Sequence, residues 1–129
     1  MEREKHLEMR MEQALKNGEF VPYLQPKYEL THETIAGAEA LVRWGSPEEG
    51  MIFPGEFIPL FEKNGFIVEL DLYMFEQVCK MIESWHKNGY RIIPVSVNMS
   101  RGHFLVPNFF DRYKEILERY DVPKGSIEI

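Results

Sequence analysis

Two charged side chains interrupt an otherwise apolar segment, and their spacing is suited to chemistry. Residues 38–44 read AEALVRW, with Glu39 in a run of small and apolar residues and Arg43 four positions later. In a β-strand alternate side chains share a face, so Glu39, Leu41 and Arg43 would lie on one side and the alanines and Trp44 on the other. The carboxylate could pair with the guanidinium or bind a metal ion, and spacing alone favours the ion pair.

A second oxygen donor stands near the end of another predicted strand, VSVNMS, where Asn98 shares a face with Ser96 and Ser100. A carboxylate and an amide carbonyl are hard ligands that suit Mg²⁺ or Mn²⁺ better than zinc. The four histidines show no metal-ligand spacing. A strand asparagine is also a common backbone hydrogen bonder, so both interpretations of Asn98 stay open.

The elements that would position these residues follow from hydrophobic periodicity. Residues 2–17 have the pattern of an amphipathic helix, and residues 20–30 and 34–44 predict the two strands of a hairpin. Prolines place the first strand at an edge or at bulges. The turn formers at 45–50 indicate a loop, and 54–65 a short helix closed by Asn-Gly.

A strongly amphipathic helix is predicted next, with Asp71 as its N-cap and Gly89 just past its end. Cys79 lies on the apolar stripe of this helix. It is interpreted as a small buried hydrophobe rather than a nucleophile.

Strand and helix then alternate, which predicts parallel strands joined by crossovers. Residues 90–100 form a strand, Pro107 opens a helix, and a further strand begins at Ser126 shortly before the sequence stops at Ile129. Such a sheet would have an open edge and few covering helices. We therefore expect the N-terminal half of a (β/α)8 barrel, a fold that takes about 250 residues and places its active site at the carboxyl ends of its strands.

Composition limits the classes of function that the chain can have. The chain has 129 residues, of which 44% are hydrophobic and 13% aromatic, enough for a folded core. A net charge of −6 argues against general nucleic-acid binding. No apolar run is long enough for a membrane span, and the single cysteine is typical of a reducing compartment, so we expect a cytoplasmic location.

Several segments together resemble the EAL domain, the family of cyclic di-GMP phosphodiesterases. In family order they are YLQPKYEL, GAEALVRW, FIPLFEKNG, LDLYMFEQVC, VSVNMS and VPKGSIEI. The resemblance implies an EAL domain over residues 20–129, truncated to the first half of its barrel, after an N-terminal amphipathic helix or linker over residues 1–19. It also implies a modified TIM-like barrel that starts with one antiparallel strand, in agreement with the predicted hairpin.

The resemblance carries over to individual residues. Glu39 is similar to the glutamate and Asn98 to the asparagine with which the family binds metal. Gln25 and Arg43 resemble its contacts to the ligand's base and phosphate, and Leu41 its apolar contact to a guanine. These matches imply binding of cyclic di-GMP and its hydrolysis to linear pGpG by a pair of Mg²⁺ or Mn²⁺ ions.

The sequence departs from the family pattern at its end. Glu128 matches the first glutamate of a family segment written LELEITE, whose second glutamate, a metal ligand, would fall one position beyond Ile129. The family's Asp-Asp pair, catalytic lysine and further metal-binding glutamate have no counterpart. Two oxygen donors do not satisfy two ions that each take about six ligands.

We therefore expect catalysis in the intact parent domain and not in these 129 residues alone. The alternative is a non-catalytic module that binds cyclic di-GMP or a regulatory protein partner. Because half a barrel exposes apolar surface and strand edges, self-association is also predicted.

Overall fold

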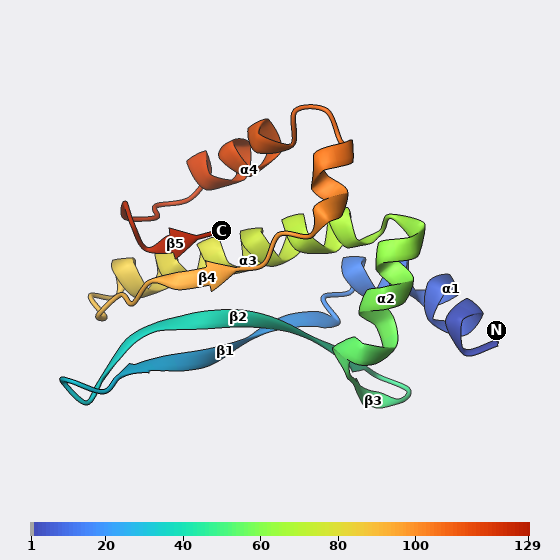
Figure 1. The fold of residues 1–129 in the computed structure, drawn as a ribbon, viewed down its shortest axis with the longest axis horizontal. Coiled ribbons are helices and arrows are strands. Elements are labelled where there is room, and N and C mark those ends of the chain that lie inside the picture. The colour runs from blue at the N-terminus through green and yellow to red at the C-terminus, as the bar shows by residue number, and fades with distance from the viewer. Residues whose placement is uncertain (1) are drawn as a thin grey trace.

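One mixed β-sheet organises the chain, and a long helix lies along one of its faces (Figure 1). The computed structural model describes residues 2–129, apart from the side chains of residues 104 and 105. The strand order is β1-β2-β4-β5, with β3 paired to β2 off this path. In chain order the elements are α1 (Glu2–Lys16), β1 (Phe20–Glu29), β2 (Thr34–Ser46), β3 (Gly50–Ile52), α2 (Pro54–Asn64), α3 (Ile67–Lys87), β4 (Val95–Val97), the 3₁₀ helix η1 (Arg101–Leu105), α4 (Phe109–Glu118) and β5 (Ile127–Glu128).

The predicted hairpin and the predicted parallel strands are both confirmed. β1 and β2 pair antiparallel, and β1 is the outermost strand, where its prolines are tolerated. β2 pairs with β4 and β4 with β5 in parallel. These pairings confirm the predicted α/β class. They include the antiparallel first strand expected for the first half of a TIM-like barrel.

Side-chain alternation in β2 separates a buried face from a partly open one. Ala38, Ala40 and Trp44 are buried on the face covered by α3, while Glu39 and Leu41 are only half-buried on the other. Small side chains let the helix approach the strand closely. Glu39 therefore lies on the face of β2 that α3 does not cover.

An aromatic cluster fixes the far end of the hairpin against α2. Phe20, Trp44, Phe57 and Phe61 are all buried, and the ring centroids of Phe20 and Trp44 lie 4.8 Å apart. The indole Nε1 of Trp44 donates to a carboxylate oxygen of Glu19 at 3.0 Å. This packing holds the strand end that leads to the candidate site.

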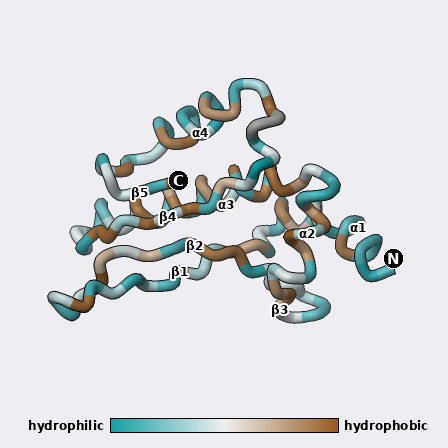
Figure 2. The backbone as a smooth tube through the Cα atoms, viewed as in Figure 1, coloured by the Kyte–Doolittle hydropathy of each residue, from teal (hydrophilic) through white to brown (hydrophobic). Residues whose placement is uncertain are grey.

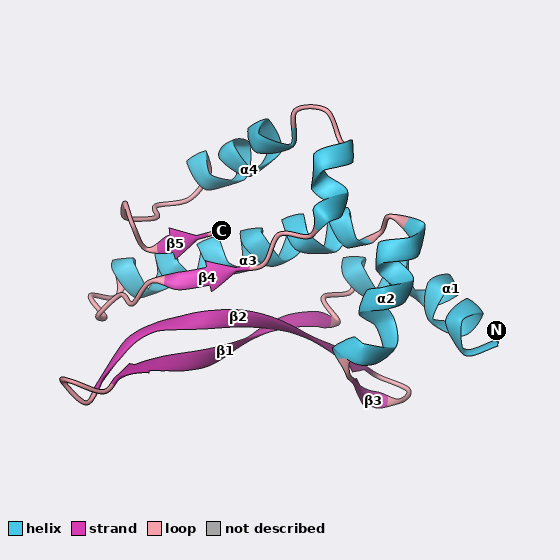
Figure 3. Ribbon diagram, in the orientation of Figure 1, coloured by secondary structure: helices cyan, strands magenta, loops and turns pink. Residues whose placement is uncertain are grey.

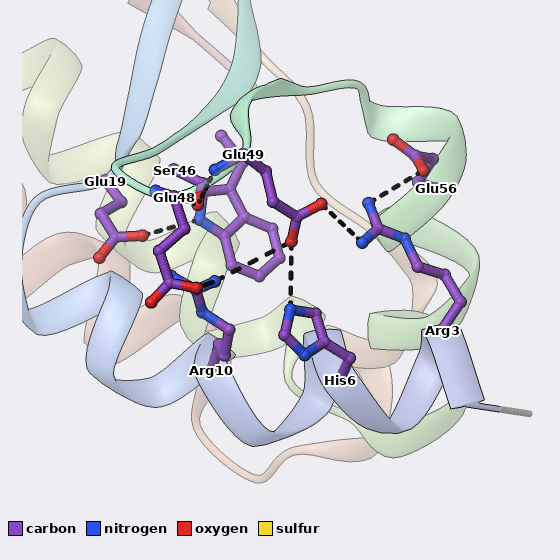
Figure 4. A network of polar contacts seen from close by, with 9 residues as sticks. Arg3, His6, Arg10, Glu19, Ser46, Glu48, Glu49 and Glu56 are labelled. Carbon is purple, nitrogen blue, oxygen red and sulfur yellow. Dashed lines mark hydrogen bonds and ion pairs between the residues drawn. The ribbon is translucent and has the colours of Figure 1, made fainter.

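Helix α1 is attached to the β2–β3 turn by ion pairs (Figure 4). Arg3 Nη1 lies 2.6 Å from Glu49 Oε1, and His6 Nε2 lies 3.2 Å from Glu49 Oε2. Arg10 Nη1 lies 2.8 Å from Glu48 Oε2. The predicted N-terminal helix is therefore part of the folded unit.

The prediction that Asp71 caps α3 is wrong. The helix begins at Ile67, because Gly65 is left-handed with φ of 85° and the Asn64 side chain accepts the Phe66 N–H at 2.9 Å. Because of these two features, α3 begins within a few residues of the end of α2. Asp71 consequently lies inside α3.

Other boundaries also differ from the prediction (Figure 3). Residues 45–50 are not a simple loop, because β2 continues to Ser46 and pairs with β3. The strand predicted for 90–100 contracts to Val95–Val97, and the 3₁₀ helix Arg101–Leu105 follows it. Hydrophobic and hydrophilic residues alternate along α4 (Figure 2), which begins two residues after Pro107. Among residues 2–129, no helix combines the length and hydropathy needed to cross a bilayer.

Candidate functional site

Strand pairing places four polar residues in one row across the sheet. Gln25 on β1 is the register partner of Glu39 on β2, which pairs with Ser96 on β4, which in turn pairs with Glu128 on β5. Register partners point to the same face, and this face is the one opposite α3. The row therefore holds two carboxylates, one amide and one hydroxyl side by side.

Glu39 and Asn98 meet although 59 positions separate them in sequence, since Asn98 Nδ2 lies 3.5 Å from Glu39 Oε1. Asn98 follows directly after β4, at its carboxyl end. The contact is long for a hydrogen bond, so neither group is committed to the other. A half-turn of the Asn98 side-chain amide exchanges the positions of its nitrogen and oxygen. The amide oxygen and the Glu39 carboxylate oxygen could then bind the same ion. This donor set fits part of a Mg²⁺ or Mn²⁺ site.

Arg43 has partners other than Glu39. Its Nη1 donates to the backbone oxygen of Val42 at 2.9 Å, and its Cζ lies 5.7 Å from the ring centroid of Tyr23. None of the ion pairs among residues 2–129 joins Arg43 to Glu39. The ion-pair interpretation that spacing favoured is therefore wrong, and the Glu39 carboxylate remains available to a ligand.

A cleft of about 550 Å³ opens at the carboxyl ends of β2 and β4. Of the predicted site residues, Leu41, Arg43 and Asn98 line it. Glu39 adjoins the cleft through Asn98, and Gln25 stands beside Glu39 on the exposed edge strand. The structure thus gathers the predicted residues around the carboxyl end of β4, with Gln25 outside the cleft itself.

The sequence analysis missed three charged residues that line the cleft: Glu62, Asp71 and Arg101. Asp71 had a detectable signal, because it is a carboxylate on a turn of α3 whose neighbours Leu70 and Leu72 are buried. Glu62 and Arg101 lie on segments whose side chains follow no diagnostic spacing.

A further cation reaches the polar row from the edge strand. Lys27 Nζ donates to Ser96 Oγ at 2.9 Å, although the two residues lie on strands separated by β2. The register partner of Lys27 on the intervening strand is Gly37, so the lysine reaches past β2 from a position two residues before the Glu39 pair. An ammonium group is therefore bound at Ser96, the register partner of both Glu39 and Glu128.

The buried thiol takes no part in this site. Burial, and to a smaller extent the charge of Glu76, raises the pKa of Cys79 to about 12. Its interpretation as a buried hydrophobe is confirmed.

Comparison with known proteins agrees with the fold and the motifs. The model of the EAL domain family matches residues 8–129. Signaling protein YkoW of Bacillus subtilis is 31% identical over 122 residues, which are 95% of this chain and 15% of that protein. The bifunctional diguanylate cyclase/cyclic di-GMP phosphodiesterase MucR of Pseudomonas aeruginosa is 32% identical over 117 residues, 91% of this chain and 17% of that protein.

Solved structures resemble the chain over nearly its whole length. The PaMucR phosphodiesterase in complex with c-di-GMP superposes with a TM-score of 0.85 at 30% identity, covering 95% of this chain and 49% of that one. The EAL enzyme Bd1971 in its cGMP-bound form gives a TM-score of 0.82 at 27% identity, covering 96% and 36%. The chain therefore spans at most about half the length of these structures.

Proposed function

Because the chain belongs to the EAL domain family, we propose that its open sheet face and the adjoining cleft form the first half of a cyclic di-GMP phosphodiesterase site. The observation that carries the proposal is the meeting of Glu39, in the middle of β2, with Asn98 at the carboxyl end of β4. A phosphodiesterase of this kind hydrolyses cyclic di-GMP to linear pGpG. Residues 20–129 would be the truncated domain, and residues 1–19 its N-terminal helix.

Glu39 and Asn98 would hold a divalent cation, in keeping with the general metal dependence of the family. Both offer hard oxygen atoms, which favours Mg²⁺ or Mn²⁺. When bound, such an ion would supply a Lewis acid and lower the pKa of a water molecule. The chain's own contribution is to hold a carboxylate and an amide on neighbouring strands.

Gln25, Leu41 and Arg43 would bind the nucleotide. Arg43 offers a planar fork of N–H donors in the cleft, suited to phosphate oxygens. Leu41 lines the same cleft with an apolar side chain suited to a base, and Gln25 presents an exposed amide beside Glu39. Their arrangement would orient a phosphodiester over the carboxylate.

The 129 residues alone would not hydrolyse the ligand. In the part of the chain that the structure describes, no group of three or more His, Cys, Asp or Glu residues could hold a metal ion. The same observation favours a second candidate, a module that binds cyclic di-GMP or a protein partner without cleaving the nucleotide. Either function would operate in the cytoplasm, where a free thiol such as Cys79 stays reduced.

Self-association is part of the proposal. β1 and β5 are the outermost strands of the β1-β2-β4-β5 path, and Tyr23, Leu30 and Ile129 are exposed. Unpaired strand edges with apolar side chains favour pairing with a second chain. Light scattering over a range of concentrations tests this, and a monomer at every concentration would contradict it.

The metal assignment is tested by replacing Glu39 with Gln, which keeps the shape of the side chain and removes its charge. Mn²⁺ broadens the NMR signals of nearby amides, so a titration reports even weak binding. We expect broadening around Glu39 and Asn98 in the wild type and its loss in the Glu39→Gln variant. The matched control is Glu33→Gln, an exposed residue in the turn of the same hairpin, which should broaden like the wild type.

Ligand binding and chemistry need separate measurements. Calorimetry should detect cyclic di-GMP binding by the wild-type chain, and chromatography of the same mixture with Mn²⁺ should show no pGpG. Formation of pGpG would overturn the expected inactivity. Absence of both Mn²⁺ broadening and nucleotide binding would contradict the proposed site.

A further inference from the structure

We propose that Asp71 is a positioning residue, which fixes the segment after β4 and thereby holds Asn98 in place for the ion. The inference rests on the proposed function, because it assigns the ion to Asn98. It concerns a residue of α3, on the far side of β2 from the open sheet face. Asp71 acts through the backbone of this segment and through His103.

The first contact joins Asp71 to the backbone next to Asn98. Because α3 begins at Ile67, Asp71 lies in its second turn, and its Oδ2 accepts the Ser100 N–H at 2.9 Å. Ser100 is only two residues beyond Asn98, so this bond restrains the backbone that aims the Asn98 side chain. A carboxylate acceptor makes the bond stronger than one to a neutral oxygen would be.

The second contact passes through a buried imidazole. His103 is 1% exposed, and its Nε2 lies 3.0 Å from Asp71 Oδ2 and 3.2 Å from the Tyr113 hydroxyl. Its Nδ1 is buried and finds no hydrogen-bond partner within the described residues. A carboxylate oxygen only accepts, so Nε2 carries a hydrogen and donates it to Asp71 Oδ2.

The tyrosine completes the network from α4. Burial, followed by the charge of Asp71, raises the pKa of Tyr113, so its hydroxyl stays protonated. Asp71 thus connects α3 to the segment after β4 directly, and to η1 and α4 through His103. Three elements consequently constrain the segment that carries Asn98.

The location of this network distinguishes positioning from general stabilisation. Asp71, Asn98 and Ser100 all line the same cleft, and the Asp71 side chain is only 13% exposed. A carboxylate with so little exposure is held in one direction by its partners, and its removal leaves the buried His103 without its acceptor. Groups that orient metal ligands from behind typically change metal affinity about 10–100-fold when they are removed.

The test uses the 129-residue chain and two readouts, amide hydrogen exchange of residues 98–103 and Mn²⁺ affinity from NMR line broadening. In Asp71→Ala we expect exchange of this segment to accelerate about tenfold or more while α3 stays protected, and Mn²⁺ affinity to fall about tenfold or more. His103→Ala should shift both readouts in the same direction. His103→Gln should largely restore them, because its side-chain amide still provides an N–H donor.

The matched control is Glu69→Gln, which removes another α3 carboxylate. Glu69 pairs with Arg112 of α4 at 3.1 Å on an exposed face, and within the described residues no hydrogen bond or ion pair joins it to the segment after β4. Both readouts should match the wild type. If Asp71→Ala does not fold, Asp71→Asn keeps the shape and one acceptor oxygen, and it should shift both readouts by a smaller amount.

The outcomes separate this inference from the proposed function. Mn²⁺ binding absent from the wild type would refute the metal site whatever the exchange data show. Wild-type binding with unchanged exchange and affinity in the Asp71 variants would overturn the positioning role. Acceleration of exchange that is uniform along the chain would also overturn it, since Asp71 would then only stabilise the fold.

Discussion

Replacing Gly37 with alanine should disturb the spacing between β2 and β4, on which the meeting of Glu39 and Asn98 depends. A Cβ at position 37 would lie 2.9 Å from the backbone oxygen of Pro94. That oxygen accepts the Ala38 N–H at 2.9 Å, at the start of the parallel pairing. The atom that must move is therefore backbone, and it cannot rotate away as a flexible side chain would.

The size of the effect follows from two opposing contributions. The new methyl must move away from the carbonyl by some tenths of an ångström, and overpacking of this kind costs about 1–3 kcal/mol. Replacing glycine also lowers the conformational entropy of the unfolded chain. This stabilises the folded state by about 0.4–1 kcal/mol and offsets part of the overpacking cost. Gly37 has no left-handed backbone, so no further strain is added. The net expectation is a loss of about 1–2 kcal/mol in the free energy of unfolding.

Urea unfolding followed by tryptophan fluorescence measures this difference. The matched control is Gly55→Ala in the first turn of α2, where an added Cβ has no heavy atom within 4 Å. There alanine should stabilise the chain by about 0.5–1 kcal/mol. A Gly37→Ala chain as stable as the wild type, with the same dependence on urea, would refute the close-approach argument.

Two further results are expected. A hydrogen bond from Arg3 lowers the pKa of Glu49 below its ordinary value of 4.5, so its stabilisation of α1 is present above that value and is lost as the pH falls through the lowered pKa. Hydrogen exchange of α1 should accelerate over that acid range, and Glu49→Gln should accelerate it already at neutral pH; protection that persists unchanged in acid would contradict the ion-pair attachment. Cys79 should react with a disulfide reagent at neutral pH only after unfolding by urea, because its pKa is raised to about 12; immediate labelling of the folded chain would contradict its burial.

The elements whose signal is local were predictable from the sequence. The hairpin and the alternation around Glu39 follow from a period of two, and that period correctly assigned the buried and open faces of β2. The short strand β3 escaped prediction because its three residues are too few to show a period. Its pairing depends on β2 extending beyond the aromatic cluster to Ser46, which is a tertiary effect.

The site was predictable only in part, for a related reason. Glu39 and Asn98 were found because each stands out in its own strand and matches a family motif. Asp71 was assigned to a helix cap because a single carboxylate stands before an apolar stripe there. A carboxylate on the side of a helix that has already begun gives the same sequence pattern. Only the position of the segment after β4 distinguishes the two roles of the carboxylate. That position is not visible in the local sequence, because Asp71 contacts Ser100, 29 positions later.

Charge balance across the sheet links these observations. The row that holds Glu39 and Glu128 receives the ammonium of Lys27, whose Nζ donates to Ser96 Oγ of β4 past the intervening strand β2. Ser96 is the register partner of both carboxylate-bearing residues, so a cation bound there lowers the negative potential of the row. Glycine at position 37 therefore matters for this row as well as for packing, because it allows β2 and β4 to approach at Pro94, two residues before the Glu39–Ser96 pair.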